Sequence, residues 1–140
     1  MKHPLMKLWI VIAIVSAIFE GGLGLLMRSS MANNVIVPWR QPTTANAPVF
    51  MLLALCFGAG FSYIFLQGYR GTGIREGVRF GFWVTLVASV PYVLALSVML
   101  PIGRRIPAEM FAIDLATFVA CGIVAAAMVG ETVTAKGAAA

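Results

Sequence analysis

Four long stretches of apolar residues, separated by short polar segments, dominate the pattern of this chain. Each stretch is about 20 residues long, which is the length of helix that crosses a hydrocarbon core of about 30 Å. Because backbone N–H and C=O groups cannot remain unpaired in hydrocarbon, each stretch is expected to be a helix. The pattern therefore predicts an all-α bundle of four transmembrane helices, over about residues 8–27, 48–67, 80–100 and 108–129.

The segments between these stretches are rich in residues that end helices, such as Gly, Pro, Asn and Thr. The first connection, 29–47, is the longest, and its Val35–Trp39 part is apolar enough to lie along the membrane interface with Trp39 as an anchor. The small, Ala-rich tail after Glu131 is expected to be frayed. Pro91 falls inside the third stretch and is expected to kink its helix.

The composition points to the same class of protein. Of the 140 residues, 61% are hydrophobic and only 11% are charged, whereas about a quarter of the residues in a soluble domain are charged. A chain this short has too much surface to bury such an excess in a soluble core. We therefore expect a single membrane domain over residues 1–140, with the lipid bilayer as its solvent. The expected location is the bacterial inner membrane, with an uncleaved first span rather than a signal peptide.

The net charge of +5 comes from basic residues that lie singly or in pairs beside the apolar stretches. Such residues are typical of flanks that face phospholipid headgroups, so we expect no nucleic-acid partner. The positive-inside rule places both termini on the cytoplasmic side, because six basic residues then lie inside and four outside. The inner set is Lys2, Lys7, Arg70, Arg75, Arg79 and Lys136, and the outer set is Arg28, Arg40, Arg104 and Arg105.

Small residues recur at a spacing of four within the predicted spans, which lets helix backbones approach closely in a membrane. The sets are Ala13, Ala17 and Gly21; Ala54, Gly58 and Ser62; Gly77 and Gly81; and Thr117, Cys121 and Ala125. They predict helix contacts within one bundle or with a partner subunit or a second copy of the chain. The spacing does not separate these alternatives.

Two carboxylates, Glu20 and Asp114, lie inside predicted spans. A charged group at the bilayer centre costs about 2.5–3.5 kcal/mol on insertion scales, so such residues usually have a partner or a function. With helices that run in opposite directions, both lie roughly 10 Å below the outer surface, and Tyr92 reaches a similar depth. One hypothesis is a shared ligand or proton site of Glu20, Tyr92 and Asp114, in which one carboxyl holds a proton. The alternative is that each carboxyl is protonated on its own or pairs with an arginine of the rim.

The chain carries no catalytic, cofactor-binding or metal-binding motif. His3 is its only histidine, and no second ligand accompanies it. Cys56 and Cys121 form no Cys-x-x-Cys motif and lie in apolar stretches, where two separate thiols are favoured over a disulfide. The run Glu20–Gly24 lacks the lysine of a phosphate-binding loop, and its glycines favour close helix packing. We therefore expect no cofactor and no metal, and the chemistry favours a protein without enzymatic activity.

Three short motifs carry a family resemblance: Pro38-Trp39-Arg40, the segment Ile74–Phe82, and Met99-Leu100-Pro101-Ile102. The chain resembles uncharacterised small bacterial four-helix integral membrane proteins. In those proteins a Trp-Arg loop is followed by a Gly-x-Arg-Phe-Gly entry to the third span and a Leu-Pro-Ile exit from it. They carry no assigned activity, so the resemblance implies fold and topology only.

Two functional hypotheses of different class follow from the sequence. The first is a structural or accessory membrane subunit that acts through helix–helix contacts with a larger complex or with itself. The small-residue sets, the lack of a soluble domain and the scarcity of polar groups favour it. The second is a small ligand-binding or proton-handling membrane protein that uses the two carboxylates within the spans.

Overall fold

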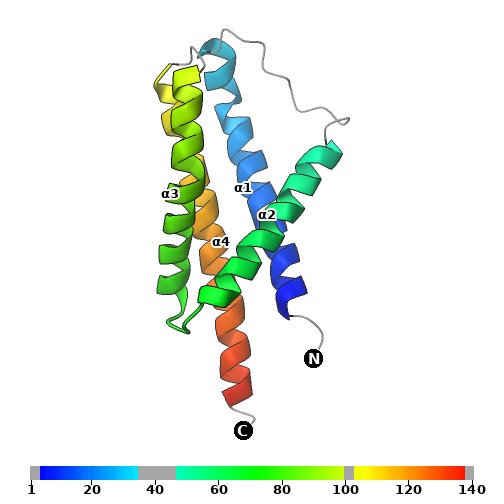
Figure 1. Cartoon of the computed structure of the whole chain (residues 1–140). Coiled ribbons are helices and arrows are strands. Elements are labelled where there is room, and N and C mark those ends of the chain that lie inside the picture. Colours follow the sequence, from blue (N-terminus) through cyan, green and yellow to red (C-terminus); the bar gives the residue numbers. More distant parts are fainter. Residues whose placement is uncertain (1–3, 35–46, 100–102, 138–140) are drawn as a thin grey trace.

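The computed structural model describes residues 4–34, 47–99 and 103–137. This part of the chain forms four helices: α1 (Pro4–Asn34), α2 (Ala47–Gly68), α3 (Ile74–Met99) and α4 (Arg105–Gly137) (Figure 1). Each helix is long and apolar enough to cross a membrane. For the described residues, the predicted all-α fold with four helices of membrane-spanning length is therefore confirmed.

Three of the helices extend several residues beyond the apolar stretches that predicted them, whereas α2 is longer by one residue at each end. α1 continues to Asn34 and α4 continues to Gly137, so residues expected in a loop and in a frayed tail are helical. α3 begins at Ile74 and remains one uninterrupted helix through Pro91. An apolar stretch marks only the part of a helix that fits into hydrocarbon, whereas backbone hydrogen bonding continues into the interface. The expected interfacial anchor, Trp39, lies outside the described residues.

The connection between α2 and α3 is a tight turn stabilised by Glu76. Gly71 and Gly73 adopt positive φ angles of 86° and 75°, which residues with a side chain rarely adopt. One oxygen of the Glu76 carboxylate accepts a hydrogen bond from the backbone N–H of Arg70 at 2.7 Å. The other accepts hydrogen bonds from the backbone N–H and the hydroxyl of Thr72, both at 3.0 Å. These bonds hold the turn against the first turn of α3.

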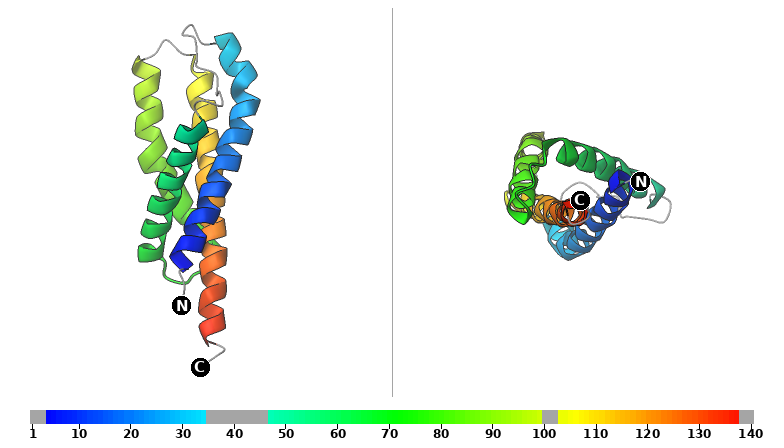
Figure 2. Two further views of the ribbon diagram at one scale, coloured as in Figure 1. Left: turned by 90° about the vertical axis from the view of Figure 1, so that its right-hand side faces the viewer. Right: turned by 90° about the horizontal axis from the view of Figure 1, so that it is seen from below.

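α4 is the central helix of the bundle. It packs antiparallel along both α3 and α1, and α1 also packs along α2. α2 crosses α1 obliquely, so its C-terminal end lies beside α3 and its N-terminal end swings away from α3 and α4 (Figures 1 and 2). The α2–α3 turn, the start of α1 and the end of α4 lie at one end of the bundle, called the turn end below. The start of α4 lies at the opposite end, called the far end.

Glycines let α3 and α4 touch through their backbones. A Cβ atom on Gly77 would collide with the carbonyl oxygen of Gly122, and one on Gly81 would collide with the carbonyl oxygen of Phe118. These positions belong to a seam of buried residues that repeats every four positions along α3. The seam consists of Gly77, Gly81, Thr85, Ser89 and Val93.

Gly58 has the same role between α1 and α2. A Cβ atom on Gly58 would lie 2.8 Å from the carbonyl oxygen of Trp9. Close by, the indole Nε1–H of Trp9 donates a hydrogen bond to the carbonyl oxygen of Leu55 at 2.6 Å. In the same small-residue set of α2, Ser62 is buried and Ala54 is half-buried. α1 and α2 are therefore joined by a backbone contact and by a polar bond.

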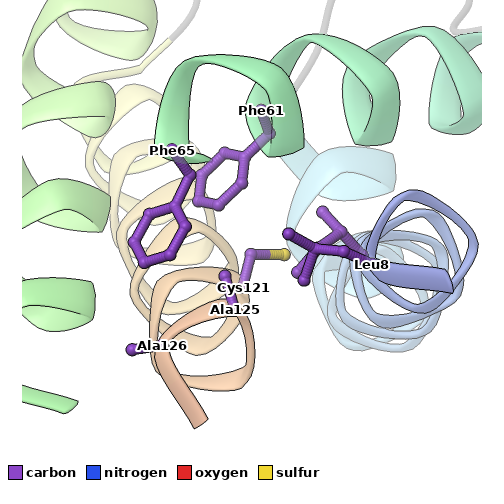
Figure 3. Packing of buried hydrophobic residues seen from close by; sticks show 7 residues of the cluster. Leu8, Phe61, Phe65, Cys121, Ala125 and Ala126 are labelled. Atoms are coloured by element: carbon purple, nitrogen blue, oxygen red, sulfur yellow. The ribbon is translucent and has the colours of Figure 1, made fainter. Parts of the chain in front are cut away.

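The hydrophobic core lies towards the turn end, where α1, α2 and α4 meet (Figure 3). Small side chains on α4 let the aromatic rings of α2 approach the central helix. Phe80 of α3 adds edge-on ring contacts to Phe61 and Phe65, with ring centroids 5.1 and 5.2 Å apart. The buried members of the core are Leu8, Ile12, Phe61, Phe65, Cys121, Ala125 and Ala126.

Candidate functional site

The two carboxylates within the apolar helices lie at a similar level of the bundle, beyond the hydrophobic core towards the far end. Glu20 is about two turns after Ile12 on α1, and Asp114 is about two turns before Cys121 on α4. Because α1 and α4 run antiparallel and pack against each other, these positions come to the same level. Glu20 and Asp114 are near enough for their charges to interact.

Asp114 is fixed by a hydroxyl from α3. It is half-buried, and the Ser89 side chain donates a hydrogen bond to its carboxylate. Ser89 is only 3% exposed and belongs to the seam that joins α3 to α4. Asp114 is therefore bonded to α3 through Ser89 and lies on α4, which also packs against α1, the helix that carries Glu20.

Glu20, in contrast, keeps an exposed surface. α2 packs on α1 but swings away from α3 and α4 towards its N-terminal end (Figure 2). Among the described residues, no atom of another helix lies within 4 Å of where a Cβ atom on the neighbouring Gly21 or Gly22 would lie. The sequence favoured close helix packing at these glycines; within the described part of the chain no other helix packs against Gly21 or Gly22, because α2 crosses α1 obliquely and diverges here (Figure 1).

Further polar groups lie within about one turn of each carboxylate. Ser16 precedes Glu20 by one turn on α1, is 1% exposed and donates a hydrogen bond to a carbonyl of its own helix at 3.1 Å. Thr117 follows Asp114 on α4 and is fully buried, and its Oγ1 atom has no hydrogen-bond partner among the described residues. One further turn along α4, the buried thiol of Cys121 belongs to the hydrophobic core.

The α3 residue that contacts Asp114 is Ser89, whereas depth in the membrane predicted Tyr92. Tyr92 is 53% exposed, and within the described part of the chain it forms no hydrogen bond. Ser89, almost one turn earlier, is the α3 residue that bonds Asp114. Depth in the membrane indicated Tyr92, but the side of the helix decides which residue points inward. The spacing of four that links Gly77 to Val93 is the sequence signal that identifies Ser89.

The rim arginines near the start of α4 have surroundings other than the intramembrane carboxylates with which the alternative hypothesis pairs them. Arg104 and Arg105 are exposed, the first just before α4 and the second at its first residue, and the Arg105 guanidinium pairs with the Glu109 carboxylate one turn later. The side chain of Arg28 lies outside the described part of the chain. Within that part, no arginine forms an ion pair with either intramembrane carboxylate.

The chemistry at this site is limited to two carboxylates, hydroxyls and a thiol. No group of three or more His, Cys, Asp or Glu side chains that could hold a metal ion occurs among the described residues. Cys56 and Cys121 are both free thiols, the first exposed and the second buried. Comparison of the chain with protein-family models, curated proteins and solved structures gives no match. The carboxylate pair is the feature of this structure that bears most directly on function.

Proposed function

We propose that this protein binds and releases a proton at the carboxylate pair of Glu20 and Asp114. The supporting observation is that the antiparallel packing of α1 and α4 brings the two carboxylates to the same level of the bundle, where their charges can interact. Two neighbouring carboxylates in a poorly solvated site cannot both ionise cheaply, because each negative charge disfavours the other. A pair of this kind titrates as one unit and holds a shared proton.

The surroundings of the two carboxyl groups suggest different roles. The Ser89 hydroxyl donates to Asp114 and so stabilises a negative charge on it. The described residues supply no hydrogen-bond donor to Glu20, which also keeps an exposed surface. Asp114 is therefore the partner that holds the charge, and Glu20 is the side chain that takes up and releases the proton.

Infrared difference spectroscopy across a pH step, on protein reconstituted in lipid, tests this proposal. The wild type is expected to show the band of a protonated carboxyl, and Glu20→Gln should abolish it. Asp114→Asn should shift or abolish it, because the remaining carboxyl loses the charge that it interacts with. Glu109→Gln is the matched control, because Glu109 pairs with Arg105 near the far end. A band that persists unchanged in both pair variants would contradict the proposal.

We also propose a second role, as a structural or accessory subunit that acts through helix–helix contacts. Ala17 and Gly21 of α1 are exposed and lie four residues apart, beside Glu20. In the part of the chain that the structure describes, no atom of another helix lies within 4 Å of a Cβ atom placed on Gly21. A helix of a second copy or of a partner subunit can approach such a surface closely. It would also cover the exposed side of Glu20, which is costly to leave in contact with lipid.

Purification in mild detergent tests this second role. A second copy or another polypeptide should co-purify with the wild-type protein, and Gly21→Leu should abolish this association. Gly60→Leu is the control, because Gly60 is also exposed with open space around it, but on α2. A single chain in both the wild type and the control would count against a subunit role.

A further inference from the structure

A shallow groove of about 640 Å³ runs between α3 and α4 on the outer surface of the bundle. The backbone contacts at Gly77 and Gly81 bring the two helices close together. The small side chains of Ala112 and Ala116 leave space beside this contact, and both residues are exposed. Larger apolar side chains complete the lining, namely Val78, Phe82, Leu115 and Val119.

Two arginines line the same groove near the turn end. Arg75 and Arg79 are both exposed and lie in the first two turns of α3. Neither guanidinium forms an ion pair within the described part of the chain. The acid between them, Glu76, directs both carboxylate oxygens to the α2–α3 turn instead. Two uncompensated positive charges therefore lie where the apolar groove begins.

The groove has the position of a lipid chain in one leaflet. From Arg75 to Phe82 it follows α3 for about 10 Å, at 1.5 Å per residue. One leaflet contributes half of a hydrocarbon core of about 30 Å. The groove therefore extends from the membrane interface well into a single leaflet. The arginines mark its interfacial end, because they also line the polar cleft of the α2–α3 turn.

We propose that this groove binds an anionic phospholipid, with the phosphate between Arg75 and Arg79 and an acyl chain along the groove. Guanidinium groups bind phosphate oxygens through paired, charge-assisted hydrogen bonds. The apolar lining suits an acyl chain, since hydrocarbon is the solvent that surrounds this surface in a membrane. A net negative headgroup complements two unpaired cations, whereas a zwitterionic headgroup brings its own positive charge. The negative charge of the headgroup therefore determines which lipid binds, and the acyl chain packs along the groove.

Native mass spectrometry of protein extracted with equal amounts of phosphatidylglycerol and phosphatidylcholine tests the headgroup contact. The wild type should retain phosphatidylglycerol preferentially. Arg75→Gln and Arg79→Gln should each reduce that retention by about fivefold. Arg104→Gln with Arg105→Gln is the control, because it removes two exposed positive charges at the far end and leaves the groove intact. An equal loss in this control would show a general charge effect and overturn the site.

A second pair of variants tests the groove with the arginines in place. Ala116→Phe fills the groove and should reduce phosphatidylglycerol retention, and the exposed position tolerates the larger side chain. Val87→Phe is the control, because Val87 is 76% exposed on α3 and does not line the groove. Retention at the wild-type level in Ala116→Phe would overturn the proposal even if the arginine variants failed to fold. Circular dichroism and gel filtration establish that each compared variant is folded.

Discussion

Ser89 and Thr117 are both buried hydroxyl residues beside Asp114, and they differ in whether the hydroxyl has a partner. Ser89 donates to the Asp114 carboxylate, whereas Thr117 Oγ1 has no partner among the described residues. A buried hydroxyl contributes to stability only when it is hydrogen-bonded, because burial removes it from other donors and acceptors. The two residues therefore allow a paired test of the polar cluster.

Ser89→Ala is expected to lower the free energy of unfolding by about 1 kcal/mol, because it leaves a carboxylate without its donor. Thr117→Val keeps the shape of the side chain and removes an unpartnered hydroxyl, so it should be neutral or stabilising by up to about 1 kcal/mol. Equilibrium unfolding in mixed micelles measures both changes. A loss in Thr117→Val as large as that in Ser89→Ala would mean that the Thr117 hydroxyl has a partner in the membrane.

Trp9 offers a second test at the residue scale, in the contact between α1 and α2. Its indole N–H donates to the Leu55 carbonyl oxygen at 2.6 Å. Trp9→Phe keeps an aromatic ring and removes this donor, so it should lower the free energy of unfolding by about 1 kcal/mol. The same micelle assay measures the loss, with Trp83→Phe as the control, because the Trp83 side chain is 54% exposed. Equal effects of the two substitutions would contradict a specific role for the bond.

Helix pairing at the element scale depends on a few positions without a side chain. Gly77, Gly81 and Gly122 bring the backbones of α3 and α4 into contact, and Gly58 does the same for α1 and α2. Gly60 lies on α2, and no atom of another described helix lies within 4 Å of the position that its Cβ atom would take. Some glycines of this chain are therefore required for helix–helix contact, whereas others, such as Gly60, are not.

Gly77→Ala should lower the free energy of unfolding by about 1–3 kcal/mol, because the added methyl group forces α3 and α4 apart. Gly60→Ala should instead be neutral or stabilising by about 0.5–1 kcal/mol, because alanine favours the helix and meets nothing. Unfolding in mixed micelles compares the two variants directly. Destabilisation by Gly60→Ala to the same extent would show that α2 has a packing partner outside this chain.

At the scale of the whole molecule, the even number of helices brings the start of α1 and the end of α4 to the turn end. Arg70, Arg75 and Arg79 also lie at or near this end, within the α2–α3 turn and the first turns of α3. Basic residues in short loops favour the cytoplasmic side of the membrane. We therefore propose that the turn end faces the cytoplasm.

Cysteine labelling in intact cells measures this orientation. A membrane-impermeant thiol reagent added from outside should fail to label Thr72→Cys in the turn and should label Gly103→Cys at the far end. The wild type is the blank, because Cys56 and Cys121 lie inside apolar helices. The reverse labelling pattern would invert the proposed topology and place the phospholipid groove in the outer leaflet.

The apolar pattern alone determined that the chain folds as four long helices, because each stretch must satisfy its own backbone hydrogen bonds in lipid. It also placed Glu20 and Asp114 at a common level, since a rise of 1.5 Å per residue converts sequence position into depth. The spacing of four marked Gly58, Gly77 and Gly81, and the structure places each of them between helices. These features depend on a single helix, so a single stretch of sequence is enough to predict them.

Only the tertiary structure decided which helices pair, how each is rotated and where they diverge. The rotation of α3 directs Ser89 rather than Tyr92 to Asp114, and the contact of α1 with α4 brings Glu20 near the same carboxylate. Among the described residues, the oblique crossing of α2 leaves Gly21 without a neighbouring helix, so its spacing of four does not mark a contact within this part of the chain. Rotation and crossing angle depend on how side chains from segments far apart in sequence fit together. The depth of a residue can therefore be predicted from its own helix, whereas a site between helices depends on how all the helices pack together.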